Sequence, residues 1–393
     1  MPRRLDIPIH SCSAENVNDA GTKYLIQANN GLLYCVFIHT DLDVYFRFSS
    51  NGGLTWGNPV AIFVGSATHL SVWYDRWSGL TSDLIHVAYT ESVTDDTLYR
   101  TINTASSDAL STQTVIFAGS TTATGGHLSI TRARGGNVYC KTVIDAGAEG
   151  GFYRLLNANV PAGAWDAART VDEAIATTDQ MILVPGFAAD NQDIMAIFWD
   201  ASADEISRKI YDDSANTWSE TSISTGMVDQ VATTNFPHFA AAVDLANSQI
   251  ILIAWNGVDL LNADLRCWTI TEGAITAKTD VVLNSADDQG LAALALDTVT
   301  GNWWAFYCGK SDGSETYSTS IQVYCKVSTD SGATWGPEIQ VTEIIRSRRG
   351  LWTIPRFSGM TMPPVSWLRN VTVLQQEISA ELLYPSLTHQ HAG

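Results

Sequence analysis

Polar side chains that could bind a ligand or transfer a proton stand at the start of regularly spaced apolar runs. Five consecutive runs open with such residues, and two later runs open with glycine: Lys23, His69, His127, Gln180, His238, Gly290 and Gly350. The steps between them are 46, 58, 53, 58, 52 and 60 residues. Ammonium, imidazole and amide groups at equivalent places of a repeat would converge on one site for a sugar, a carboxylate or a metal ion.

The elements that must position these residues are strands. Each run begins a group of about four segments that alternate with period two and are separated by Gly, Asn, Asp and Ser. A repeat near 55 residues is long enough for four strands and their loops. The sequence therefore predicts one all-β domain, a β-propeller of seven four-stranded blades, with six blades and a C-terminal appendage as the alternative. The predicted blades are residues 23–65, 66–120, 125–173, 178–225, 236–284, 288–343 and 349–380.

The ring is expected to close through the two ends of the chain. The last group supplies only three strand-like segments, and a short apolar segment, Leu5–His10, precedes the first group. If residues 5–10 add the fourth strand to the last blade, no open sheet edge remains there.

A turn motif recurs between the third and fourth segments of several groups. Ser328–Trp335 reads S-x-D-x-G-x-T-W, Ser49–Trp56 has Asn51 in place of Asp, and Asp213–Trp218 keeps only Asp, Thr and Trp. This motif resembles the Asp-box, the repeat of bacterial neuraminidases and many other propellers. Its Ser and Asp side chains can bind turn amides, its Gly permits positive φ, and its Trp can pack between sheets. We therefore interpret these residues as structural.

The resemblance leaves the function open, because sialidase-like propellers include sialidases, polysaccharide lyases, receptors and phage proteins. It implies for a sialidase three arginines around a carboxylate, an acidic Asp and a Tyr–Glu pair. That set cannot be placed here, since Asp6-Ile7-Pro8 has Asp where an arginine is wanted. Lyases such as the ulvan lyases use His and Tyr with an arginine or a cation, and they are the main enzymatic alternative.

The predicted ligand set joins the five polar run starts to two arginines near inner strands, Arg134 and Arg356. An arginine there could pair with an anionic ligand. The competing interpretation is that the run starts only cap strands and bind water, and that the arginines partner nearby carboxylates. No metal site and no cofactor is predicted, although a structural Ca²⁺ would suit so acidic a chain.

The composition of the chain limits the classes of partner that we expect. The chain of 393 residues has a net charge of −19, and such a surface repels nucleic acid. No apolar stretch is long enough for a signal peptide or a membrane span. Most of the six cysteines lie in apolar runs and are expected to be buried thiols.

Without a placeable catalytic set, the sequence favours a non-catalytic recognition or architectural propeller. Its expected context is a larger assembly such as a phage virion or tail, made in the cytoplasm, with other proteins and glycans as partners. The alternative is a glycan-active enzyme, either a polysaccharide lyase or a sialidase-like glycosidase. If the histidines bind an acidic sugar, binding should weaken as the pH rises through about 6.5, where an ordinary imidazolium loses its charge.

Overall fold

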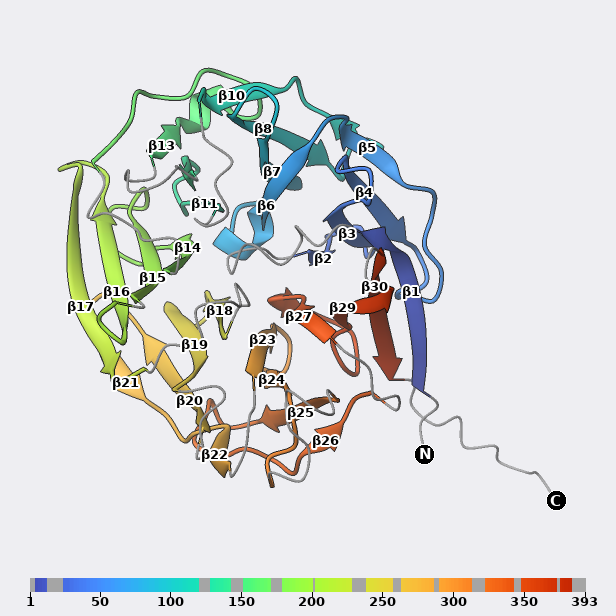
Figure 1. Ribbon diagram of the computed structural model, residues 1–393. Coiled ribbons are helices and arrows are strands. Elements are labelled where there is room, and N and C mark those ends of the chain that lie inside the picture. The colour runs from blue at the N-terminus through green and yellow to red at the C-terminus, as the bar shows by residue number, and fades with distance from the viewer. Residues whose placement is uncertain are drawn as a thin grey trace.

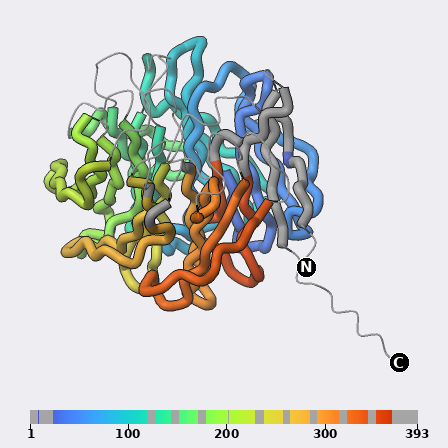
Figure 2. The backbone as a smooth tube through the Cα atoms, turned by 60° about the horizontal axis from the view of Figure 1, so that its bottom comes forward, coloured from blue at the N-terminus to red at the C-terminus, as the bar shows by residue number. Residues whose placement is uncertain are grey.

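Seven β-sheets surround a common axis in the computed structural model, counted over the residues that the structure describes (Figure 1). These are residues 4–12, 24–119, 128–142, 151–170, 179–200, 202–227, 238–256, 263–285, 290–312, 322–342, 348–372 and 375–383. The sheets follow one another around the ring in chain order, and Figure 2 shows the same order from a view turned by 60°. The chain is therefore an all-β propeller, as the sequence predicts.

Most sheets are antiparallel meanders that run outward from the axis. The first three contain β2 (Leu25–Gln27), β3 (Leu33–Ile38), β4 (Val44–Ser49) and β5 (Val60–Phe63); β6 (Ala67–Tyr74), β7 (Leu84–Glu91), β8 (Asp96–Asn103), β9 (Ala109–Leu110) and β10 (Thr114–Phe117); and β11 (Ser129–Arg132), β12 (Val138–Lys141) and β13 (Phe152–Leu155). Two short 3-10 helices follow inner or outer strands: η2 (Asp75–Ser78) and η3 (Asn157–Asn159).

The other four sheets complete the ring. They contain β14 (Gln180–Pro185), β15 (Ile194–Asp200), β16 (Glu205–Asp212) and β17 (Thr217–Thr225); β18 (Phe239–Asp244), β19 (Gln249–Trp255), β20 (Ala263–Ile270), β21 (Ile275–Ala277) and β22 (Val282–Ser285); β23 (Gly290–Asp297), β24 (Trp303–Cys308), β25 (Val323–Ser328), β26 (Ile339–Gln340) and β28 (Arg356–Phe357); and β27 (Arg348–Thr353), β29 (Val365–Thr372), β30 (Gln375–Leu383) and β1 (Arg4–Cys12).

Six of these sheets have four or five strands within the described ranges, which is the blade number of the alternative prediction. The sheet of β11 to β13 has three, followed by an isolated bridge between Phe152 and Arg169. Its outer part follows residues 157–163, where Asn, Pro and Gly favour turns and Pro161 cannot donate to a strand ladder. The structure therefore does not match the prediction that all seven blades have four strands, because this sheet has three in the described residues.

The N-terminal strand closes the last sheet. β1 pairs antiparallel with β30 from Arg4 opposite Leu383 to Cys12 opposite Gln376, with a register shift between Pro8 and His10. The predicted pairing of residues 5–10 within the C-terminal blade is confirmed. A second tie was not predicted: β28 leaves this blade and pairs in parallel with β23 of the neighbouring one.

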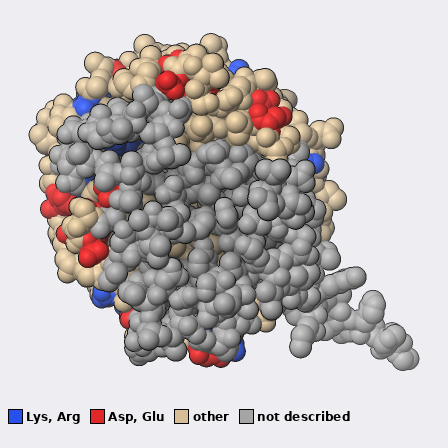
Figure 3. All heavy atoms as spheres, viewed as in Figure 1, with Lys and Arg blue, Asp and Glu red and all other residues tan. Residues whose placement is uncertain are grey.

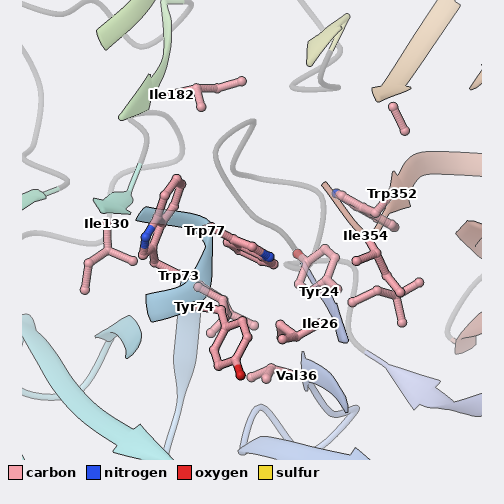
Figure 4. Close-up of a cluster of buried hydrophobic side chains, with 14 of the residues drawn as sticks. Tyr24, Ile26, Val36, Trp73, Tyr74, Trp77, Ile130, Ile182, Trp352 and Ile354 are labelled. Atoms are coloured by element: carbon pink, nitrogen blue, oxygen red, sulfur yellow. The ribbon is translucent and has the colours of Figure 1, made fainter. Parts of the chain in front are cut away.

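Aromatic side chains from several blades fill the space near the axis (Figure 4). Tyr24 meets Trp352 edge to face with ring centroids 4.5 Å apart, and Trp73 meets Trp77 in the same way at 5.4 Å. All four side chains are buried. Buried aromatic contacts of the first, second and last blades therefore lie near the axis.

The two best turn motifs accept the same pair of backbone amide hydrogen bonds. Ser49 Oγ accepts from the Gly53 amide at 2.8 Å, and Ser328 Oγ accepts from the Gly332 amide at the same distance. Asn51 and Asp330 each accept from the amide of the following Thr at 2.9 Å. These bonds occupy the side chains within the turn, so they are structural, as the sequence predicts.

Tryptophans at the ends of such turns join adjacent blades. The indole Nε1 of Trp218 donates to the Thr170 carbonyl at 3.0 Å, and that of Trp335 donates to the Thr279 carbonyl at 2.9 Å. The indole Nε1 of Trp56, at the corresponding place in the first sheet, is buried without an acceptor in the described chain.

Candidate functional site

The predicted ligand residues lie on the face of the ring where the inner strands begin. His69 lies near the start of β6, Gln180 is the first residue of β14, and His238 directly precedes β18. We call this the start face, marked by these three residues. Lys23 and His127 lie outside the described residues. The opposite side, where the inner strands finish at Gln27, Tyr74 and Asp297, is the end face.

A repeated hydrogen bond keeps neighbouring inner strands in register. Ser71 Oγ accepts from the Ile130 amide at 3.1 Å, and Ser129 Oγ accepts from the Leu183 amide at 3.0 Å. In both pairs the serine lies two residues after the residue predicted for the site in its own blade, His69 or His127. The donating amide lies three residues after the residue predicted for the site in the next blade, His127 or Gln180. The identical offsets support the repeat alignment from which the site was predicted for these three blades.

The two described histidines on the start face are uncharged, whereas the sequence predicts imidazolium groups that titrate near pH 6.5. His69 is 3 % exposed and His238 is 5 % exposed, and burial lowers the pKa of each to about 4. His69 Nδ1 lies 3.1 Å from Thr68 Oγ1, whereas neither ring nitrogen of His238 has a partner among the described residues. The expectation that they titrate near pH 6.5 is wrong, because desolvation disfavours the charged imidazolium. Both are neutral at physiological pH.

A buried cation on the start face was missed by sequence reasoning. Lys141, the last residue of β12, pairs with Ser129 across the sheet and is 5 % exposed. Its Nζ donates to the Thr142 carbonyl at 3.3 Å. A lysine inside the apolar segment 137–143 was the available signal, since lysine is rarely buried without a partner or a function.

Arg134 does not face a ligand site. Its Nε donates to the Gly186 carbonyl and its Nη2 to the Ala188 carbonyl, both at 2.8 Å. The guanidinium also lies 5.3 Å from the centre of the Phe187 ring. These contacts tie the third sheet to the loop after β14, so its role is structural rather than the predicted ligand binding.

Arg356 lies on the end face, away from the histidines with which it was grouped. It belongs to β28, which comes directly after the inner strand β27. Arg356 therefore lies at the face where the inner strands end. Its Nη1 donates to the Arg76 carbonyl at 2.6 Å, and its Nε is buried without an acceptor in the part of the chain that the structure describes. It lines a pocket of about 240 Å³.

A buried ionic cluster joins the second and third sheets near the end face. Asp75 Oδ1 accepts from His86 Nε2 and from Arg132 Nη1, both at 2.7 Å, and His86 Nδ1 lies 2.6 Å from the Tyr99 hydroxyl. Burial alone would raise the pKa of Asp75, but His86 and Arg132 together hold it well below its usual range. The arrangement resembles a catalytic relay. All four side chains are buried and bonded within the cluster, so we interpret it as a structural link between the two sheets.

The described residues contain no group of three or more His, Cys, Asp or Glu side chains arranged to hold a metal ion. The side chains of five cysteines are buried: Cys35, Cys140, Cys267, Cys308 and Cys325. No described helix is long and apolar enough to cross a membrane.

Known structures share this fold over its whole length. An ulvan lyase, described as representing a new family of polysaccharide lyase, aligns with a TM-score of 0.59 and 10% identity over 96% of this chain and 95% of its own. The same type of lyase bound to -[GlcA(1-4)Rha3S]- aligns with a TM-score of 0.58, again at 10% identity and with 96% and 95% coverage. The likeness at this identity shows the fold.

A sialidase of Streptococcus pneumoniae aligns with a TM-score of 0.46 and 9% identity over 95% of this chain and 70% of its own, a score too low to carry an argument. No protein-family model matches the chain. No curated protein matches it either.

The predicted non-catalytic role in a phage particle is contradicted by these matches. Of the structures compared above, the two with TM-scores over 0.5 are those of an ulvan lyase, and none of those compared is a phage or structural protein. The sequence argument failed because it sought a local catalytic motif. A propeller site takes single residues from several blades, so no such motif needs to exist.

Proposed function

We propose that the protein is a polysaccharide lyase that cleaves an acidic polysaccharide at the start face. The observation that carries this proposal is His238, a buried neutral imidazole with no partner on either ring nitrogen among the described residues. An unpaired buried polar group costs free energy, so its retention is best explained by a ligand that it meets. Support comes from the full-length likeness to ulvan lyase.

The chemistry of a lyase fits the groups on this face. Elimination from a uronate needs a base for the proton beside the carboxylate, a cation that stabilises the developing charge, and a proton for the departing oxygen. His69 and His238 are the candidate proton-transfer groups, and Lys141 is the candidate cation. A bound carboxylate would raise the imidazole pKa from about 4 towards the working pH, because a nearby anion favours the charged form.

Turnover of an acidic polysaccharide tests these roles. His69→Ala and His238→Ala should each lower kcat by about 10²–10⁴-fold, the usual contribution of general acid–base catalysis. His39→Ala is the matched control, because His39 is half-buried and pairs with Asp41 at 2.8 Å. If both variants keep wild-type turnover with correct folding by circular dichroism, the proposed site is wrong.

We further propose that the sheet of β11 to β13 serves as the seventh blade, and that the turns at 49–56 and 328–335 are Asp-boxes. The support is the position of that sheet between its neighbours in the ring and the same pair of backbone amide hydrogen bonds in both turns.

A further inference from the structure

The end face carries a pocket that the proposed catalytic site does not use. It has a volume of about 240 Å³ and lies where inner strands of several blades finish. Gln27 and Asn29 line it from the first blade, Tyr74 and Arg76 from the second, and Thr298 and Arg356 from the blade that contains β23 and β28. A site assembled from three blades has a fixed shape, because each blade is held by its own sheet.

The pocket is cationic in an acidic protein. Its lining contains Arg76 and Arg356 and no Asp or Glu, although the chain carries 41 acidic residues against 22 Lys and Arg. Figure 3 shows acidic side chains in several separate groups on the described part of one face. A pocket without carboxylates on such a protein favours an anionic ligand.

Arg356 keeps free donors for that ligand. Arg76 is paired with Asp83 at 2.9 Å, whereas Arg356 has no carboxylate within ion-pair distance among the described residues. Arg356 Nη1 donates to the Arg76 carbonyl and lies 3.4 Å from the Trp77 carbonyl, and its Nε is buried without an acceptor among the described residues. A planar guanidinium with unused N–H groups binds a carboxylate in a two-pronged geometry.

Size and walls define the rest of the ligand. The volume equals about eight water molecules at roughly 30 Å³ each, more than a simple inorganic anion fills. Trp77 and Phe357 lie in the wall but are each only 2 % exposed, whereas Asn29 is exposed and its side-chain amide offers hydrogen bonds to hydroxyls.

We propose that this end-face pocket binds a single uronate sugar, with its carboxylate on Arg356 and its hydroxyls beside Asn29 and Thr298. The choice of a uronate over another ring-sized carboxylate rests on the proposed function. The pocket is separate from the start face, so it serves as a product or effector site and not as the site of cleavage.

Calorimetric titration with D-glucuronate tests the site without any turnover, because a single sugar has no bond for the enzyme to cleave. The wild-type protein should bind it with a Kd of about 1 mM or tighter, and should bind D-glucose and acetate at least about tenfold more weakly. Arg356→Gln should weaken glucuronate binding at least about tenfold, since the charge-assisted contact is lost. Arg100→Gln is the matched control, because Arg100 also donates to backbone carbonyls but lies outside the pocket.

A second pair of variants leaves Arg356 in place. Thr298 is exposed and lines the pocket, while its neighbour Val299 is 74 % exposed and does not. Thr298→Asp should weaken glucuronate binding severalfold by repulsion, and Val299→Asp should not. Equal binding by all variants, or no heat with wild-type protein at about 10 mM sugar, would overturn the proposal. His238→Ala should bind glucuronate normally, so loss of turnover and loss of this pocket are distinguishable.

Discussion

Buried polar side chains near the two faces of the propeller differ in whether they have hydrogen-bond partners. On the start face, His238 is buried with no partner among the described residues and stays neutral, with its pKa lowered to about 4. Near the end face, Asp75, His86 and Arg132 are buried as deeply but bind one another at 2.7 Å. A satisfied network stabilises the fold, whereas a buried group without a partner costs free energy. The comparison separates a structural cluster from a candidate site.

The largest expected effect comes from breaking the satisfied cluster. Arg132→Ala should lower the free energy of unfolding by about 3–5 kcal/mol, because it leaves the Asp75 carboxylate buried with less compensation. Urea denaturation followed by tryptophan fluorescence measures this change. Arg100→Ala, which removes an arginine bound to carbonyls only, should cost clearly less. Equal losses would show that the cluster adds nothing beyond ordinary arginine packing.

A pH effect should come from the start face. The pKa of His69 and of His238 is about 4 in the folded protein and about 6.5 when unfolded, so the unfolded state takes up protons first as the pH falls. The stability should therefore fall below about pH 6.5, by roughly 2 kcal/mol for each histidine at pH 5. Asp75 contributes in a lower window, because its depressed pKa costs stability only below about pH 4.

The double variant His69→Gln/His238→Gln separates the contribution of the two histidines to the pH dependence of stability from that of other groups. Asp193, whose pKa burial raises to about 6, acts in the opposite direction, since it becomes easier to bury as it is protonated. The double variant should lose less stability than the wild type between pH 6.5 and pH 5. Parallel curves for the two proteins would contradict the assignment of neutral, buried histidines.

The smallest effect compares two blade junctions at the rim. Trp335→Phe removes the indole bond to the Thr279 carbonyl and should cost about 0.5–1 kcal/mol. Trp56→Phe removes an indole N–H that has no acceptor in the described chain, so it should cost less or stabilise slightly. Thermal unfolding of the two variants side by side measures the difference, and a costlier Trp56 change would refute it.

The fold was predictable because its signals are local and repeated. The strand-start residues, the turn motifs and the segment 5–10 all follow from period-two patterns and fixed spacing. The tie between β28 and β23 was not predictable, because it depends on a bend of the chain at residues 354–356 and a partner some sixty residues away.

The site was only partly predictable for a similar reason. Repeat spacing placed His69, Gln180 and His238 on one face, but it could not show that the imidazoles are desolvated. Arg356 was grouped with them because it follows an inner strand, although residues that end a strand lie on the other face. Burial and strand direction are properties of the assembled ring, so no short sequence pattern carries them.

Product analysis on acidic polysaccharides tests the central claim most directly. The protein should be incubated with a panel of uronate-containing polymers, and the products should be weighed by mass spectrometry and examined for ultraviolet absorbance. Cleavage by elimination leaves an unsaturated uronate end that absorbs, and product masses that sum to the substrate mass. We predict that result, with loss of the absorbing product in His238→Ala. Products heavier by one water, released sialic acid, or no cleavage of any uronate polymer would contradict the account.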